Sequence, residues 1–143
     1  MRLSDILRTK GSTVVTIDPD STVLDAARTL VDHNIGAVVV VEEGAPVGIL
    51  SERDILRLTS QNPQELDRTS VADIMTRDIV FAAEADSLAA AMESMTMHRI
   101  RHLPVAEEKA LVGMVSIGDV VNALRAEFEE ENQHLKQYIA GGG

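Results

Sequence analysis

The sequence contains no cysteine and no tryptophan, and one tyrosine and two phenylalanines are its only aromatic residues. The absence of cysteine excludes a disulfide framework, thiol chemistry and cysteine-ligated zinc. Cationic residues are also few: 13 Lys and Arg against 23 Asp and Glu give the 143 residues a formal net charge of −10. Without a basic face or a row of stacking aromatics, we expect no nucleic-acid partner.

Long apolar runs are absent as well. The longest runs have the length of Ala37–Val41, far short of the roughly 20 residues that a membrane-spanning helix needs. The first residues, Met1–Asp5, include an early acid and no apolar stretch of signal-peptide length. A hydrophobic content of 45% is nevertheless sufficient for a folded core. These features predict a soluble, cytoplasmic protein without a membrane partner.

An internal repeat is the main positive feature of the chain. Shifting the sequence by 65 residues against itself, from Val15 onto Val80, aligns many identical residues without a gap. These identities include His33/His98, Val40/Val105, Glu42/Glu107, Val47/Val112, Gly48/Gly113, Ser51/Ser116 and Asp54/Asp119. The upstream segment Leu3–Leu7 likewise resembles Val71–Met75. We therefore predict a tandem duplication, with a first repeat and its lead-in at 1–60, a connector at 61–70 and a second repeat at 71–143.

Each copy has the same predicted order of elements. Short apolar runs at 14–17 and 79–82 indicate strands, and apolar residues at helical spacing follow from Val23 and from Leu88. Two further apolar runs per copy indicate a pair of strands covered on both faces. A second helix is expected after Ser51 and after Ser116. The predicted fold class is thus α/β (α+β), built from two β-α-β-β-α units.

The end of each unit carries one shared motif, Gly-hydrophobic-x-Ser-x-x-Asp, at Gly48–Asp54 and at Gly113–Asp119. Together with His98–Val105 and Asp73–Thr76, these segments resemble the cystathionine-β-synthase (CBS) domain. Two such domains in tandem resemble a Bateman module, whose two units are related by pseudo-twofold symmetry. The resemblance runs from about residue 3 to residue 125 and includes no catalytic or DNA-binding domain, as in the stand-alone class of CBS-pair proteins.

Ser51 with Asp54, and Ser116 with Asp119, fall where a strand gives way to a helix. A hydroxyl and a carboxylate at these positions are what the helix start needs for its own unpaired N–H groups. The resemblance implies a second role, in which the Asp accepts hydrogen bonds from both ribose hydroxyls and the Ser binds ribose or phosphate. The two roles are compatible, and we expect ribose binding in at least one copy.

Arg101 and His102 lie at the entry to the middle strand of the second copy. The resemblance implies that cations at these two positions reach the phosphates of the ligand, for which the guanidinium fork is well suited. The alternative is a solvated arginine and a packed histidine. The first copy departs from this pattern, because Gly36 and Ala37 occupy the matching positions.

The two predicted clefts therefore differ in charge. Arg53 lies inside the motif of the first copy, where the second copy has Gly118. Lys10, just before the first strand, is a further candidate phosphate contact, although a plain loop is the simpler interpretation. We expect a mononucleotide in one cleft and a different ligand, or none, in the other.

Four apolar residues lie on or beside the predicted strands: Ile17, Ile35, Ala37 and Ile100. Their apolar character places them in the core. The resemblance implies in addition that main chain at such positions holds the edge of an adenine, while aliphatic side chains sandwich its faces. Such a contact would suit a chain with so few aromatics.

We expect neither a metal site nor a catalytic residue. His98 and His102 are four apart, but the repeat places one at a helix end and the other on a strand, so they cannot form the same-face pair of a helical zinc site. No Gly-x-Ser-x-Gly elbow is present, and the duplicated Ser and Asp are explained by the repeat.

The last helix is predicted to be unusually long, over 117–139. Val121, Phe128 and Leu135 recur at intervals of seven residues, for fewer heptads than a coiled-coil assignment requires. We expect this apolar stripe to pack on its own module or across a homodimer, in preference to a dedicated partner. The terminal Gly141–Gly143 is expected to be flexible.

These inferences favour a regulatory small-molecule sensor over an enzyme. The resemblance implies an adenine nucleotide as the bound ligand, with AMP first, ATP, ADP, NAD(H) and S-adenosylmethionine open, and no catalytic cofactor. Binding would shift the conformations of a homodimeric module, and an unidentified regulated protein would respond, as in energy sensing. The alternative is a ligand-free dimerisation or docking module acting through the C-terminal helix. A third class, a cryptic hydrolase, would turn the nucleotide over.

Overall fold

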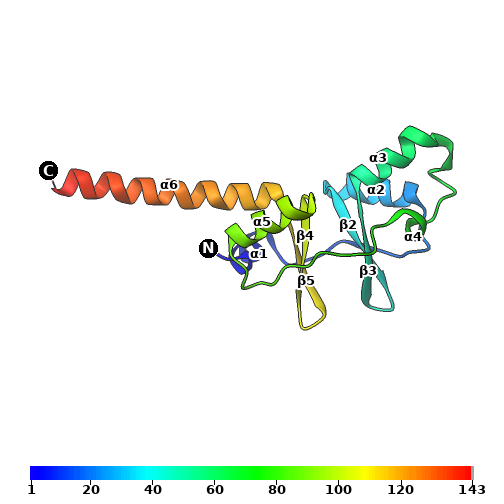
Figure 1. Ribbon diagram of the computed structural model, residues 1–143, viewed down its shortest axis with the longest axis horizontal. Coiled ribbons are helices and arrows are strands. Elements are labelled where there is room, and N and C mark those ends of the chain that lie inside the picture. Colours follow the sequence, from blue (N-terminus) through cyan, green and yellow to red (C-terminus); the bar gives the residue numbers. More distant parts are fainter. Residues whose placement is uncertain (143) are drawn as a thin grey trace.

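The structure of the chain is a computed structural model that describes residues 1–142, and residues 140–142 by their backbone alone. The first half contains the elements α1 (Leu3–Lys10), β1 (Thr16–Ile17), α2 (Val23–His33), β2 (Ala37–Glu42), β3 (Ala45–Ser51) and α3 (Glu52–Gln61). After a short 3-10 helix, η1 (Pro63–Glu65), come α4 (Val71–Ile74), α5 (Leu88–His98), β4 (His102–Glu107), β5 (Ala110–Ser116) and α6 (Ile117–Gly142). Figure 1 shows the two halves as neighbouring units, each with a β-hairpin and helices.

The duplicated order of elements is confirmed, with one exception in the second copy. In the first copy β1 pairs parallel to β2, and β2 pairs antiparallel to β3. The second copy has the matching hairpin β4–β5, but the strand predicted at 79–82 is wrong, because only a single bridge between Ala82 and Val105 forms there. Pro104 explains the difference: it has no N–H, so the ladder cannot extend past Ala82 towards Val80.

The side chains of the structure form two separate apolar cores, one in each half. The first contains Ala26, Leu30, Val38, Val40, Leu50, Val71 and Met75. The second contains Leu3, Ile6, Leu7, Ala82, Leu88, Ala91, Met95, Leu103, Val105, Val115 and Val120. Burial of this apolar surface is the main source of stability for the two units.

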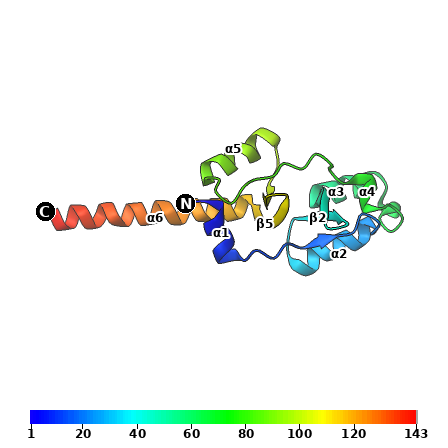
Figure 2. The ribbon, with the colours of Figure 1, turned by 90° about the horizontal axis from the view of Figure 1, so that it is seen from below.

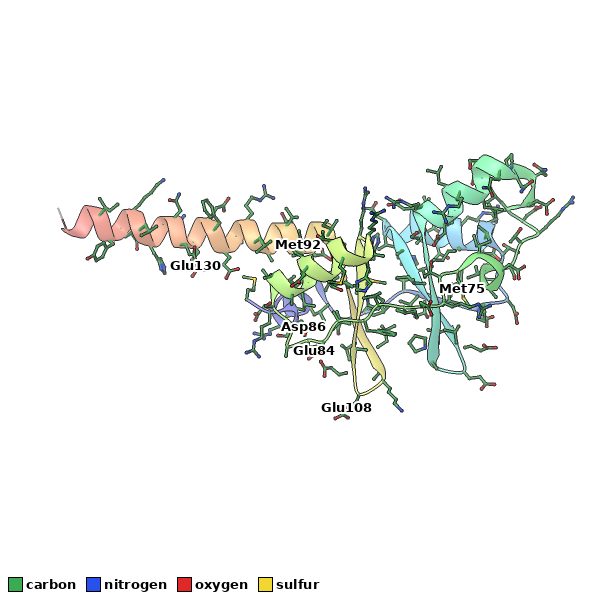
Figure 3. The ribbon with its side chains drawn as sticks, in the orientation of Figure 1. Met75, Glu84, Asp86, Met92, Glu108 and Glu130 are labelled. Atoms are coloured by element: carbon green, nitrogen blue, oxygen red, sulfur yellow. The ribbon has the colours of Figure 1, made fainter. Side chains whose placement is uncertain are left out.

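The two lead-in segments cross over between these cores. Helix α1, at the start of the chain, packs into the second core, and α4, which precedes the second repeat, packs into the first. Figures 1 and 2 show α1 beside β5 and α6, and Figure 3 shows Met75 beside α4 and β3. The predicted boundaries, 1–60, 61–70 and 71–143, therefore describe the repeats in the sequence. In the packing, each core includes a segment from the other half of the chain.

Glycine at one position of each hairpin makes this crossover possible. A Cβ added to Gly113 would lie 2.5 Å from a Leu7 methyl group, and a Cβ added to Gly48 would lie 2.4 Å from the Met75 sulfur. Leu7 and Met75 thus occupy matching positions, each filling the space left by the glycine of a hairpin. The shared glycine of the motif is explained by this close approach.

Helix α6 extends well beyond the rest of the molecule (Figure 1). Its first turns pack on the second core through Val120 and Ala123, but Phe128, Leu135 and Tyr138 are 68%, 61% and 80% exposed. The expected packing of the apolar stripe on its own module therefore holds only for the start of the helix. The expected flexible end is helical as far as Gly142, and Gly143 lies outside the described residues. Within the described chain, no helix combines the length and apolar character needed to cross a membrane.

Replacing Leu7 by alanine tests whether α1 is part of the core. The side chain is 6% exposed, so its truncation should lower the free energy of unfolding by about 2–5 kcal/mol. Leu56→Ala is the control, because Leu56 on α3 is 68% exposed and its loss should change stability by less than about 0.5 kcal/mol. Urea unfolding measures both values, and equal effects would contradict the crossover of the lead-in.

Candidate ligand cleft

A cleft of about 290 Å³ lies where the two copies meet. The first copy contributes Ala37, Ile49, Ser51, Glu52, Arg53, Asp54 and Arg57. The second copy and the segment before it contribute Thr76, Asp78, Ile79, Val80, Arg99, Ile100, Arg101, His102 and Pro104. Because residues far apart in the sequence meet here, the cleft depends on the way in which the two copies pack together.

Ser51 and Asp54 form the capping box of α3 at one wall of this cleft. The Asp54 Oδ2 atom accepts hydrogen bonds from the Ser51 backbone N–H at 2.9 Å and from its hydroxyl at 3.1 Å, while the Asp54 N–H donates to Ser51 Oγ at 3.3 Å. In the described part of the chain, Asp54 Oδ1 makes no hydrogen bond. The carboxylate therefore caps the helix with one oxygen and retains acceptor capacity on the other.

The residues of the second copy reach the cleft through a tight turn after α5. Arg99 ends that helix in the left-handed region, at φ 55°, as Asn34 does at φ 52° after α2. The Ile100 N–H then donates to the Met95 carbonyl at 3.0 Å, and the Arg101 carbonyl accepts from the Ile117 N–H at 2.8 Å. These bonds hold both sides of the Arg99–His102 segment.

A third wall comes from the segment that follows α4. Thr76 pairs with Ile49 on β3 through two backbone hydrogen bonds of 2.9 Å. This bridge fixes Thr76 at the cleft, and Asp78, Ile79 and Val80 continue along its edge. The crossover of α4 into the first core is thus what brings this segment to the cleft.

The cleft concentrates positive charge on an acidic protein. Four arginines line it, on α3 and around the turn after α5: Arg53, Arg57, Arg99 and Arg101. The acids beside them are Glu52, Asp54 and Asp78. In the described residues none of the four guanidinium groups takes part in an ion pair. Their donors are therefore available to an anionic group, for which bidentate contact is favourable.

His102 lies half-buried at the cleft, opposite Gly36. A Cβ added to Gly36 would lie 2.7 Å from the His102 Nε2 atom, so the missing side chain makes room for the imidazole. Burial lowers the pKa of His102 below its ordinary value of 6.5, and the cations Lys10 and Arg101 act in the same direction, against Glu52 and Asp119. The lowered pKa favours the neutral form of the imidazole.

The second motif, Ser116 and Asp119, has the same cap but a different surrounding. The Ser116 N–H donates to Asp119 Oδ2 at 2.9 Å, and the Asp119 N–H donates to Ser116 Oγ at 3.1 Å. The Lys10 ammonium also binds Asp119 Oδ2, at 2.7 Å. Burial opposes ionisation of this carboxyl, but the hydrogen bonds from Lys10 and Ser116 outweigh it, so the pKa of Asp119 falls below 3.8.

The structure separates the predicted site residues into two groups. Those that line the cleft are Ala37, Ser51, Arg53, Asp54, Ile100, Arg101 and His102. Those that lie elsewhere are Lys10, Ile17, Ile35, Ser116 and Asp119. Ile17 and Ile35 pack against the first core. Lys10 is the last residue of α1, so the interpretation of this position as a plain loop is wrong.

Several lining residues were missed by the sequence interpretation. The most consequential are Arg57, Arg99, Thr76 and Asp78. Helical spacing could have indicated Arg57, which follows Arg53 by one turn of α3. No local sequence pattern marks Thr76 and Asp78 as lining residues, because their position at the cleft results from the packing of α4 into the first core.

Fold and cleft together define a class of protein, a duplicated α/β module with a ligand-sized cleft between its copies. The family model of the CBS domain matches residues 3–60 and 71–126. The CBS domain-containing protein CBSX3, mitochondrial, of Arabidopsis thaliana is 41% identical over 149 residues, which cover 98% of this chain and 72% of that protein. The chain belongs to the CBS-domain family, and it contains two CBS domains in tandem.

Solved structures agree with this assignment. The CBS-domain containing protein ATU1752 from Agrobacterium tumefaciens has a TM-score of 0.83 and 40% identity, over 86% of this chain and 98% of that chain. The CBS domain protein PAE2072 from Pyrobaculum aerophilum, complexed with AMP, has a TM-score of 0.74 and 30% identity, over 83% of this chain and 89% of that chain. The expected fold class, a CBS pair with a C-terminal helix, is confirmed.

The lowered pKa of His102 predicts a pH-dependent contribution to stability. The unfolded chain binds a proton at its ordinary pKa and the folded chain only at lower pH, so this contribution is present above pH 6.5 and is lost as the pH falls. Unfolding free energies measured between about pH 7.5 and pH 5 should therefore fall less in His102→Gln than in the wild type. A steeper fall in the variant would contradict the assigned direction.

Proposed function

We propose that this chain is an adenine-nucleotide-binding regulatory module, with AMP as the first candidate ligand. The observation that carries the proposal is the meeting of Asp54, which has an unused acceptor oxygen, with four unpaired arginines in one cleft. A nucleotide has the matching chemistry, because it presents ribose hydroxyl donors next to phosphate oxygens. The complex of the similar CBS protein with AMP supports the same choice.

The ribose would bind at the start of α3. Two vicinal hydroxyl groups can donate to one carboxylate, and the Oδ1 atom of Asp54 is the acceptor that the helix cap leaves unused. Hydrogen bonds to a charged acceptor are stronger than those between neutral groups. Asp54 would therefore be the main anchor of the sugar.

The phosphate would lie among the arginines and His102. Arg53 and Arg57 approach from α3 of the first copy, and Arg99 and Arg101 from the turn of the second. A bound phosphate would raise the pKa of His102 again, since an anion favours the imidazolium form. The same charge distribution disfavours S-adenosylmethionine, whose sulfonium group carries a positive charge next to its ribose.

The adenine would lie against the aliphatic part of the lining. Ile49 and Ala37 contribute from β3 and β2, while Ile79, Val80 and Ile100 contribute from the opposite copy. These side chains offer flat contacts to both faces of a purine, and burial of its apolar surface adds favourable free energy. ATP, ADP and NAD(H) share this adenosine part, and affinity measurements must decide among them.

Such a ligand would act on the module as a conformational effector and not as a substrate. It would contact both copies at once. It would therefore stabilise the relative position of the two copies in which both can contact it. A second protein that binds the same arrangement would then be coupled to the nucleotide concentration. Surfaces of the module outside the cleft would select that regulated protein.

Asp54→Ala tests the proposed site by calorimetry with AMP. Loss of a charged acceptor for two ribose hydroxyls should weaken binding by about 10- to 100-fold. Asp25→Ala is the matched control, since Asp25 forms the same capping box with Thr22 on α2 but does not line the cleft. The control should keep the wild-type affinity. Equal effects of the two substitutions would refute Asp54 as the ribose ligand.

We further propose that a second copy of the chain covers the apolar stripe of α6. Val121, Phe128 and Leu135 recur every seven residues, and Leu124 and Tyr138 belong to a second series that Glu131 interrupts. All five apolar side chains are exposed. The helix extends beyond its own module, and in the described part of the chain no other element lies beside its distal turns (Figures 1 and 2). A homodimer through α6 would also serve the alternative function, that of a ligand-free docking module.

Leu135→Glu should weaken this association at least about tenfold, because it places a charge in the distal part of the stripe, which extends beyond the module. Gln137→Glu is the control, as it adds the same charge to the same helix outside the heptad positions. Sedimentation velocity over a range of concentrations measures the dimer, and calorimetry measures AMP binding in parallel. A Leu135→Glu variant that dimerises like the control would exclude α6 as the interface. Dimerisation without AMP binding would favour the docking function.

A further inference from the structure

The second motif is closed by a cation of the chain itself. Rather than standing open, Asp119 shares its Oδ2 atom with the Lys10 ammonium at 2.7 Å, and Lys10 also donates to the Met114 carbonyl at 2.9 Å. We infer that Lys10 is a built-in counter-ion that excludes ligand from this motif, so that each chain binds one nucleotide, in the cleft beside Asp54. The inference rests on the proposed function, because it concerns the same class of ligand.

In the second copy, the Lys10 side chain makes the contact that a backbone hydrogen bond makes in the first copy. In the first copy, the carbonyl of Ile49, which matches Met114, accepts from the Thr76 N–H at 2.9 Å. In the second copy α1 remains helical as far as Lys10, and the lysine side chain takes the corresponding carbonyl. The ammonium is thus held by two acceptors, one of them on the strand and the other on the motif.

The first copy has no equivalent of this cation. Leu7 and Met75 occupy matching positions against the two hairpin glycines, and three residues further along the chain lie Lys10 in one copy and Asp78 in the other. Asp78 lines the cleft that contains Asp54. Two carboxylates cannot form an ion pair, so the motif of the first copy stays open where that of the second is closed.

The cations of the first cleft are also missing around the second motif. Shifted by 65 residues, each arginine of the cleft meets an uncharged residue: Arg53/Gly118, Arg57/Asn122, Arg99/Asn34 and Arg101/Gly36. Lys10 is therefore the positive charge at this motif, and Asp119 already binds it. In the described residues Asp119 Oδ1 makes no hydrogen bond, as is also true of Asp54 Oδ1, but Lys10 already neutralises the charge of the Asp119 carboxylate. A ribose at this motif would therefore form a weaker charge-assisted hydrogen bond than at Asp54.

The experiment compares the wild type with Lys10→Met by calorimetry, with AMP and with adenosine as probes. The wild type should bind one equivalent of either probe per chain. Lys10→Met should still bind one equivalent of AMP at unchanged affinity, but a second equivalent of adenosine, since the freed Asp119 can accept ribose hydroxyls where no cation holds a phosphate. Adding Asp119→Asn to Lys10→Met should remove the second equivalent.

Arg8→Met is the matched control, because Arg8 lies on the same helix and pairs with Asp5 and not with Asp119. It should behave like the wild type, and thermal unfolding of each variant checks that α1 still packs. Adenosine binding of one equivalent in folded Lys10→Met would overturn the inference while leaving the proposed function intact. Weaker AMP binding in that variant would overturn it too, since Lys10 would then be a phosphate ligand. Absence of AMP binding in every variant would refute the proposed function itself.

Discussion

The crossed packing of the two lead-in segments is the interaction on which the rest of the structure depends. Leu7 fills the space above Gly113, and Met75 fills the space above Gly48, so each copy completes its core with a segment that precedes the other. Each core therefore contains side chains from both halves of the chain. The same crossing draws the segment after Met75 along β3, where Thr76 pairs with Ile49 and forms a wall of the cleft. The packing of the cores and the shape of the cleft therefore share one cause.

Duplication supplies two equal motifs, and the residues around them make the two unequal. Both carboxylates cap their helices in the same way, with one oxygen on the backbone N–H of the motif serine. The first then meets arginines and an open cleft, whereas the second meets Lys10. The motif of the first copy thus lines a cleft, while that of the second ties α1 to the hairpin and helix of the second copy. The expected difference in charge between the two copies is thus a difference between four arginines beside Asp54 and one lysine beside Asp119.

The sequence was sufficient for the repeat, most of the order of the elements and the caps formed by the two motifs, because these depend on local signals: apolar periodicity, capping residues and a duplicated motif. It failed where partners far apart in the chain decide the outcome. The strand at 79–82 is lost to Pro104 on a neighbouring strand, and Asp119 is paired with a residue 109 positions away. Ile17 and Ile35 looked equivalent to Ala37 and Ile100, but only packing decides which of them reach the cleft.

A net charge of −10 opposes an anionic ligand, but the strength of this repulsion depends on distance. At physiological ionic strength, exposed charges more than about 8 Å apart are largely screened. The acids of α6, such as Glu129 and Glu130, lie on a helix that extends away from the first copy (Figure 3), so their repulsion at the cleft is weak. The four arginines line the cleft itself, so an anion bound there would lie within the distance at which screening is weak. The net charge of the protein therefore does not determine the sign of the local charge at the cleft.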